Sequence, residues 1–400
     1  MKHRKTQLAA AVGAALLVGG TAAQAQAPAT VGAGMSNITV QLYGQVNRAL
    51  MWADDGHDNK VFHVDGQPSS TRFGIPGSGT ATPGLRIGAQ FEAEMKSNPS
   101  NVVNFGNTGG LTGQTGASAG AVGVDAPSAA SPSDFVLLTE RWLDIWFEGG
   151  WGKINMGQGS GAADDASTID LSGTGLANGV CFCDWGGGIR WKNSAGVAIG
   201  PTVEGTHNNQ DFESRYDRVM YTTPTFGGLR GQVGWGQKSD AGEVAEASLW
   251  YSAKLAGTLQ AAIGWSSENV ARSATVTGAN ETVGGSISWL HNSGFNVTGA
   301  YTKADNLTSS SVGDGFAGDS KFWYGKVGYK FGQHAVAVHY GEHEDHALAG
   351  DEGKSYGVGY VWNPIAWAEV YANYHIFQLD RVGVSVEDVT VATIGTRVRF

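Results

Sequence analysis

The feature that most constrains this chain is a strict two-residue alternation of apolar and polar side chains, repeated in many segments. In residues 85–96, the odd positions are Leu, Ile, Ala, Phe, Ala and Met, and the even positions are Arg, Gly, Gln, Glu, Glu and Lys. The same rhythm returns in residues 229–236, in 245–255 and in later segments up to the carboxyl terminus. Neighbouring side chains of a β-strand point to opposite faces. The sequence therefore predicts an all-β protein whose strands have one apolar and one polar face.

The length of the segments and the spacing of the turns separate a membrane barrel from a soluble sandwich. Each run has about 9 to 12 residues, which is the length that a tilted membrane-spanning strand needs. Tight turns at 223–228, 256–257, 292–294, 332–333 and 363–364 alternate with longer polar loops, such as 305–319 and 342–353. Short turns at one end and long loops at the other are typical of transmembrane β-barrels.

Counting on this basis predicts a 16-stranded antiparallel transmembrane β-barrel. The strands are expected near residues 38–52, 69–76, 84–97, 139–148, 151–158, 212–223, 228–238, 243–255, 257–267, 280–291, 294–304, 319–331, 333–342, 353–362, 365–377 and 388–400. An even number of strands places both termini at the end with short turns. A barrel of this size is too wide for side chains to fill, so its polar inner face would meet water.

The amino terminus predicts export from the cytoplasm. Lys2, Arg4 and Lys5 precede an apolar run, and the small residues at 23–25 complete a signal peptide, residues 1–25. Residues 26–37 are a short lead-in, and residues 38–400 form the barrel. Cleavage leaves 23 Lys and Arg against 36 Asp and Glu, a formal net charge of −13. No later stretch approaches the roughly 18 apolar residues of a membrane-spanning helix.

The sequence gives little indication of a disulfide, a metal site or a catalytic site. Cys181 and Cys183 are the only cysteines, and we expect them to be free or locally paired, since a ring that small strains a disulfide. The run at 342–346, Glu-His-Glu-Asp-His, is interpreted as a solvated loop tip. No Gly-x-Ser-x-Gly motif frames a nucleophile. We expect no enzymatic activity, no cofactor, no bound metal and no nucleic-acid partner.

Four stretches resemble the general Gram-negative porins. Residues 40–46, Val-Gln-Leu-Tyr-Gly-Gln-Val, look like the first strand of that family, and 69–74, Ser-Ser-Thr-Arg-Phe-Gly, like the second. Residues 215–224 look like its mid-barrel strand. The end of the chain, 396–400, resembles its terminal strand, in which Phe400 would be the aromatic that the barrel-assembly machinery reads. The resemblance extends over essentially the whole mature chain.

The resemblance implies homotrimers in the outer membrane, in contact with lipid and lipopolysaccharide. Each monomer would hold its own pore, narrowed by a long loop that folds inward after the fifth strand, here about residues 159–211. That loop contains Asp164, Asp165 and Asp170 as acidic constriction residues. It lacks the Pro-Glu-Phe-Gly-Gly-Asp stretch of the enteric members.

A basic wall is expected opposite these acids. Inward parity or the family motif assigns Arg72, Arg86 and Arg141 to it, with Lys153 and Arg218 as further candidates. Opposite charges across a constriction create a transverse field that tunes selectivity. The negative net charge favours weak cation selectivity, whereas the arginines argue the other way.

The predicted function is a water-filled channel for passive diffusion of ions and small hydrophilic solutes. One alternative is a channel selective for a sugar or an organic acid, whose lumen would carry an aromatic slide. Inward parity offers for that slide Trp250, Tyr324, Trp367 and Tyr371. A second alternative is a structural or adhesive barrel plugged by its own loops.

Overall fold

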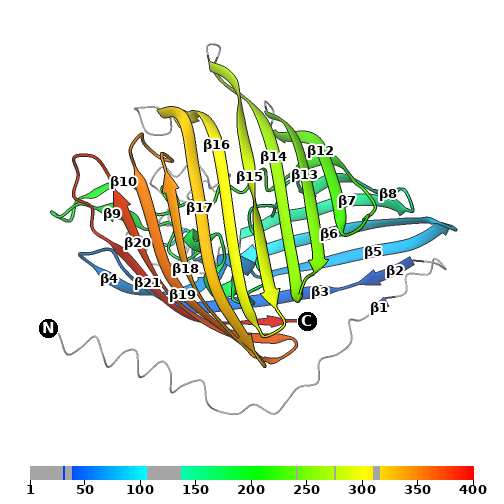
Figure 1. The fold of residues 1–400 in the computed structure, drawn as a ribbon, viewed down its shortest axis with the longest axis horizontal. Coiled ribbons are helices and arrows are strands. Elements are labelled where there is room, and N and C mark those ends of the chain that lie inside the picture. Colours follow the sequence, from blue (N-terminus) through cyan, green and yellow to red (C-terminus); the bar gives the residue numbers. More distant parts are fainter. Residues whose placement is uncertain (1–29, 32–37, 106–136, 240–241, 274–275, 310–315) are drawn as a thin grey trace.

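The computed structural model describes residues 30–31, 38–105, 137–239, 242–273, 276–309 and 316–400. The predicted signal peptide, residues 1–25, lies outside the described residues. Antiparallel strands lie side by side in one continuous curved wall (Figure 1). Among the described residues, no helix is long and apolar enough to cross a membrane.

The wall is a barrel of sixteen antiparallel strands, as the alternation predicts. The first strand is β2 (Ile38–Gln41) followed by β3 (Tyr43–Asp54), and the second is β4 (Asn59–Asp65) followed by β5 (Arg72–Thr82) after the 3-10 turn η1 (Gln67–Ser69). Both β4 and β5 pair with β3. The other strands are β6 (Leu85–Lys96), β7 (Leu137–Gly149), β8 (Gly152–Ser160), β11 (Arg215–Thr222), β12 (Leu229–Ser239), β13 (Gly242–Lys254), β14 (Gly257–Ser273), β15 (Val276–His291), β16 (Phe295–Ser309), β17 (Phe316–Phe331), β18 (His334–Glu344), β19 (Glu352–Ile365), β20 (Ala368–Asp380) and β21 (Val389–Arg399).

The second strand begins ten residues earlier than the sequence predicts, at Asn59 instead of residue 69. In β4 the inward residues Phe62 and Val64 are apolar and buried, and the outward Val61 is exposed. The inner face is therefore apolar, and the exposed face carries Asn59, Val61 and His63, so the pattern of apolar outward and polar inward residues is missing here.

The barrel closes where β21 pairs with β3, for example Ile394 opposite Leu50. The last residue continues this pairing, because Phe400 and Gly44 exchange two backbone hydrogen bonds of 2.9 Å. A Cβ atom on Gly44 would lie 2.6 Å from the Phe400 ring. Glycine is thus needed at this position for the terminal aromatic to pack against the first strand.

The outer face of the wall is apolar. In β14, Ile263 is 63% exposed, and Val283 of β15 is 52% exposed. The same parity exposes Val338 of β18 and Val219 of β11. So many exposed aliphatic side chains would be unfavourable in water, at about 25 cal/mol per Å², whereas a lipid bilayer accommodates them.

Residues 161–214, which we call the inner segment, connect β8 to β11. They form the helix α2 (Gly175–Asn178), the 3-10 turn η4 (Phe182–Asp184) and a small hairpin of β9 (Arg190–Lys192) and β10 (Ala198–Thr202). The segment is green in Figure 1, where it runs within the curve of the wall. Its contacts, described next, place it on the inner face of the barrel.

Candidate functional site

Hydrogen bonds attach the inner segment to successive strands of the wall. Gly161 N donates to Ser214 O at 3.1 Å, which closes the base of the segment. Ser286 Oγ of β15 donates to Ala166 O at 2.7 Å, and Ile169 N donates back to the same hydroxyl at 2.9 Å. Farther along, Asn178 Nδ2 donates to Ala337 O of β18 at 3.2 Å. A wall hydroxyl thus satisfies backbone groups of the segment, and a wall carbonyl accepts from one of its side chains, as buried polar groups require.

An aromatic core fixes the middle of the inner segment. Phe182 is buried and stacks on His339 of β18, with ring centroids 5.3 Å apart. Trp185 is also buried, packs on Tyr371 of β20 and donates its indole N–H to Leu176 O at 3.1 Å. Burial of an aromatic side chain contributes strongly to packing. These contacts hold the segment against β17–β21 and β3–β4.

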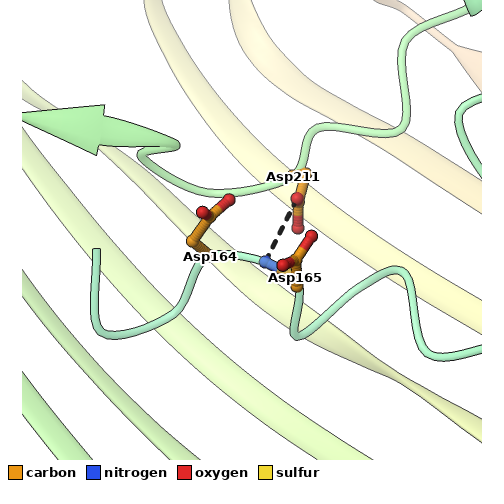
Figure 2. Close-up of side chains that lie close together, drawn as sticks. All are labelled: Asp164, Asp165 and Asp211. Atoms are coloured by element: carbon orange, nitrogen blue, oxygen red, sulfur yellow. Dashed lines mark hydrogen bonds between the residues drawn. The ribbon is translucent and has the colours of Figure 1, made fainter. Parts of the chain in front are cut away.

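Asp164 and Asp165 lie at the start of the inner segment, next to Asp211 from its end. One oxygen of each carboxylate lies within 4.8 Å of the others, and Figure 2 shows the three side chains facing one another. We call these residues the acidic cluster. Asp165 N donates to Asp211 Oδ2 at 3.3 Å, and Ser167 Oγ donates to Asp211 Oδ1 at 2.7 Å. The structure therefore brings two of the three predicted acids together and adds Asp211.

Burial and mutual repulsion change the acidity of the cluster. Burial, followed by the charges of Asp165 and Asp211, raises the pKa of Asp164. Burial and the neighbouring Asp165 raise the pKa of Asp211 to about 6. Three carboxylates at this spacing disfavour one another's charged forms.

The third predicted acid, Asp170, forms an ion pair with the wall. Lys326 Nζ of β17 lies 2.5 Å from Asp170 Oδ2 and also donates to Asn178 O at 2.7 Å. The Lys326 side chain is fully buried. Asp170 is thus neutralised locally, and Lys326 is a wall cation that the sequence analysis did not select, although its inward parity in β17 was readable.

The residues predicted to form one basic wall lie in several separate parts of the barrel. Arg141 Nε lies 2.6 Å from Glu92 Oε1, and its Nη1 lies 3.0 Å from Glu94 Oε2. Arg72 Nη1 lies 3.8 Å from the same Glu92 Oε1, and its Nη2 donates to Ser69 Oγ at 2.8 Å. These two arginines lie together, and the glutamates of β6 form ion pairs with them and with Lys96, whose Nζ lies 2.9 Å from Glu94 Oε1.

The other three predicted cations lie elsewhere. The Arg218 side chain is fully buried, with Nη2 3.1 Å from Asp144 Oδ2, and so cannot face a lumen. Arg86 and Lys153 lie at the short-turn end of the wall, where both contact the ring of Trp146. Arg86 is also exposed and lies 3.2 Å from Glu148. Arg218 Nε also donates to Ser160 O at 2.8 Å, directly before the start of the inner segment.

A cavity of 410 Å³ lies between part of the inner segment and the wall. Arg397 of β21 lines it and lies 2.5 Å from Glu369 Oε2 of β20, which also lines it. The inner segment contributes to its lining Asp165, Thr168, Asp170, Gly173, Gly175, Leu176, Gly179, Val180, Cys181, Asp184 and Asp211. Burial raises the pKa of Asp184 to about 8, so this acid is neutral at pH 7. Arg397 was not predicted as a wall residue, although the alternation with the outward Val398 gives it inward parity in the sequence.

The structure also locates two members of the suggested aromatic slide and the histidines of the 342–346 run. Tyr324 and Tyr371 are buried beneath the inner segment, so these two members of the suggested aromatic slide do not face an open lumen. In the 342–346 run, His343 and His346 stack with centroids 4.2 Å apart, and His343 Nδ1 accepts from Asn208 N at 3.1 Å. Within the described residues, the acidic cluster is the group of three whose geometry suits a metal ion.

Comparison with known proteins agrees with this architecture. The model of the Gram-negative porin family matches residues 9–381. A comparison with curated proteins gives no match.

Solved structures of similar fold include an anion-selective porin from Comamonas acidovorans, with a TM-score of 0.61, 15% identity and coverage of 91% of this chain and 100% of that chain. OmpF of Salmonella typhi in complex with daunomycin has a TM-score of 0.59 and 14% identity, covering 91% and 98%. The trimer form of OmpT of Vibrio cholerae has a TM-score of 0.55 and 15% identity, covering 91% and 100%. At sequence identities this low, the similarity to these structures shows a shared fold and nothing more. Because the family match spans most of the chain and the sixteen-stranded barrel agrees with it, this protein belongs to the Gram-negative porin family, as an outer-membrane channel and not an enzyme.

Proposed function

We propose that the 410 Å³ cavity beside the inner segment is the constriction of the channel, through which ions and small hydrophilic solutes diffuse passively with a weak preference for cations. The observation that supports this proposal is the charge of the residues that line the cavity. Asp165 and Asp211 face the cavity, whereas the cation Arg397 is paired with Glu369. The lining is therefore net negative, and a negative field in a narrow passage concentrates cations.

Much of the positive charge of the wall is paired. Arg72, Arg141 and Lys96 form ion pairs with Glu92 and Glu94, and Lys326 forms one with Asp170. This pairing reduces the field of the arginines that favour anion selectivity and leaves one positive charge at Glu92 and Glu94. Asp164, Asp165 and Asp170 of the inner segment and Arg72 and Arg141 of the wall remain the proposed constriction residues, with Arg397 added to the wall. Arg218 is buried, and Arg86 and Lys153 lie at the short-turn end.

The family also guides the proposal for export and assembly. We propose that residues 1–25 are removed as a signal peptide, which leaves a mature net charge of −13 from 23 basic and 36 acidic residues. We further propose a homotrimer in contact with lipopolysaccharide, inserted by the barrel-assembly machinery through Phe400. One relative was solved in a trimer form.

The zero-current potential in a potassium chloride gradient tests the preference. The wild-type protein, refolded and inserted in a planar bilayer, is expected to give the sign of a cation-selective pore. The double variant Asp165→Asn/Asp211→Asn should move the potential towards zero. Glu148→Gln, which removes a charge at the exposed Arg86 pair, is the control and should leave the potential close to wild type. An anion-selective sign in the wild type would reject the proposal.

A plugged barrel is the second candidate, and one observation favours it. The inner segment packs into a hydrophobic cluster of 23 buried residues, which fills much of one side of the barrel. A plugged barrel would show no conductance in the same bilayer experiment. A substrate-selective channel would instead conduct, and a specific sugar or organic acid would block its current.

A further inference from the structure

We propose that the acidic cluster, Asp164, Asp165 and Asp211, binds a divalent cation of the calcium type. One oxygen from each carboxylate lies within 4.8 Å of the other two. Oxygens this close together can bind one ion in common, because two oxygens on opposite sides of a Ca²⁺ ion, at a bond length of about 2.4 Å, are about 4.8 Å apart. A hard cation such as Ca²⁺ prefers oxygen ligands of this kind.

Asp164 gives a second, independent indication of a ligand. The residue is only 9% exposed, and its Oδ2 atom is buried without a hydrogen-bond partner. A buried carboxylate oxygen without a donor is costly, and a cation would supply the missing partner. Figure 2 shows the Asp164 carboxylate turned towards Asp211.

The cluster lacks a protein cation that would neutralise it. In the part of the chain that the structure describes, no Lys or Arg forms an ion pair with any of the three carboxylates. The charge of Arg215 acts on Asp164 from a greater distance, and the effects of burial, Asp165 and Asp211 outweigh it. Asp211 is already oriented, because Ser167 Oγ and Asp165 N donate to its two oxygens. Such outer hydrogen bonds fix a ligand in place.

The position of the cluster provides a route by which the ion can enter and predicts how its binding changes ion selectivity. Asp165 and Asp211 also line the 410 Å³ cavity, so a hydrated ion would arrive from that side. A bound Ca²⁺ would cancel most of the charge of the cluster and weaken the preference for cations. This effect rests on the proposed constriction, whereas binding itself does not.

Terbium luminescence measures the binding directly. Tb³⁺ replaces Ca²⁺ at oxygen sites, and Trp250 packs against the small core formed by Ala163 and Ala166 beside the cluster, where it can transfer excitation energy. Refolded protein in neutral detergent should show saturable emission at one Tb³⁺ per chain. Calcium should displace it at about 10⁻⁴ to 10⁻³ M, the range of weak extracellular sites.

Single substitutions identify the ligands. Asp164→Asn and Asp211→Asn should each weaken Tb³⁺ binding at least about tenfold, as the loss of a charged ligand does. Glu204→Gln is the matched control, because it removes an acid from the same segment but outside the cluster and the cavity lining, where Asn101 Nδ2 donates to Glu204 Oε2 at 3.4 Å, and it should change binding less than twofold. Absence of saturable emission, or equal losses in Asp164→Asn and Glu204→Gln, would overturn the site.

Folding is checked for each variant by its heat-dependent mobility in gel electrophoresis. If Asp164→Asn does not fold, Asp165→Asn and Asp211→Asn decide the question with the same readout. A wild-type pore that is cation-selective but binds no Tb³⁺ contradicts the site and leaves the constriction standing. Binding of Tb³⁺ without any change of selectivity supports the site and contradicts the constriction.

Discussion

The two sides of the inner segment differ in how they meet the barrel. On the side of β3–β4 and β16–β21, a cluster of 23 buried apolar residues joins segment and wall. On the side of β13–β15, only Ala163, Ala166, Phe212 and Ala262 form a buried cluster. Serine hydroxyls make most of that second contact, as Ser286 does with Ala166 O. The segment is thus packed firmly along one wall and hydrogen-bonded to the other.

Different residues of the inner segment therefore anchor it to the wall and carry the charge at the cavity. The aromatic residues of the middle of the segment are buried, whereas Asp165 and Asp211, from its two ends, remain at the cavity. Substitutions in the anchor should therefore change stability and the width of the passage. Substitutions of the acids should change selectivity and leave the packing intact.

Trp185→Ala is expected to give the largest effect. The side chain is buried between segment and wall, and removal of a buried aromatic costs about 3–5 kcal/mol. Thermal unfolding in detergent should occur at lower temperature, and single-channel conductance should rise because the segment loosens. The control is Trp151→Ala at the exposed β7–β8 turn, where the indole is 44% exposed. Equal losses in both variants would contradict the anchoring role.

Lys326→Met should have the next largest effect. The substitution leaves Asp170 without its partner in a buried ion pair, a loss that costs about 3–5 kcal/mol in other proteins. Chemical denaturation of the refolded barrel measures it. The double variant Lys326→Met/Asp170→Leu should recover much of the loss, because both charges are then absent. If the double variant is as unstable as the single one, the pair does not account for the effect.

Acidification should weaken cation selectivity. The pKa of Asp211 is raised to about 6, so its charge at the cavity disappears as the pH falls through 6. The zero-current potential should move towards zero between pH 7 and pH 5, and Asp211→Asn should remove most of this change. Because the folded state holds the proton more tightly than the unfolded state, this group lowers stability as the pH rises from about 4 to 6. A potential independent of pH would contradict the placement of Asp211 at the constriction.

Arg86→Ala should give the smallest effect. Its partner Glu148 is 3.2 Å away, but both side chains are about half exposed, and exposed ion pairs contribute about 0–1 kcal/mol. Neither the unfolding temperature nor the zero-current potential should change measurably. A clear change of selectivity would show that the wall at the short-turn end also controls the passage.

The sequence predicted the barrel well because the alternation of lipid-facing and lumen-facing residues is a local signal. The sixteen strands of the wall agree with the prediction. The signal failed in β4, where Phe62 and Val64 face inward yet are apolar. They pack into the cluster that includes Trp185 and Trp191 of the inner segment, and such long-range packing leaves no period in the sequence.

The site was harder to predict, because residues distant in sequence determine whether each charged side chain is paired or buried. Asp165 was selected, but Asp211, 46 positions away, hydrogen-bonds to its backbone and stood at the limit of the expected loop. Arg218 has the inward parity of a wall cation, yet Asp144 of β7 pairs with it in the protein interior. Parity shows which face a side chain occupies and does not show whether another chain segment covers that face.

The two cysteines permit the most direct test that current passes beside the inner segment. Cys181 lines the cavity, whereas Cys183 is only 5% exposed and does not line it. Burial raises the pKa of both thiols, so a positively charged methanethiosulfonate, which the negative lining attracts, is applied at alkaline pH. Single-channel current should fall in the wild type and in Cys183→Ser but not in Cys181→Ser. Unchanged current in a wild-type channel whose Cys181 is shown by mass spectrometry to be modified would contradict this route.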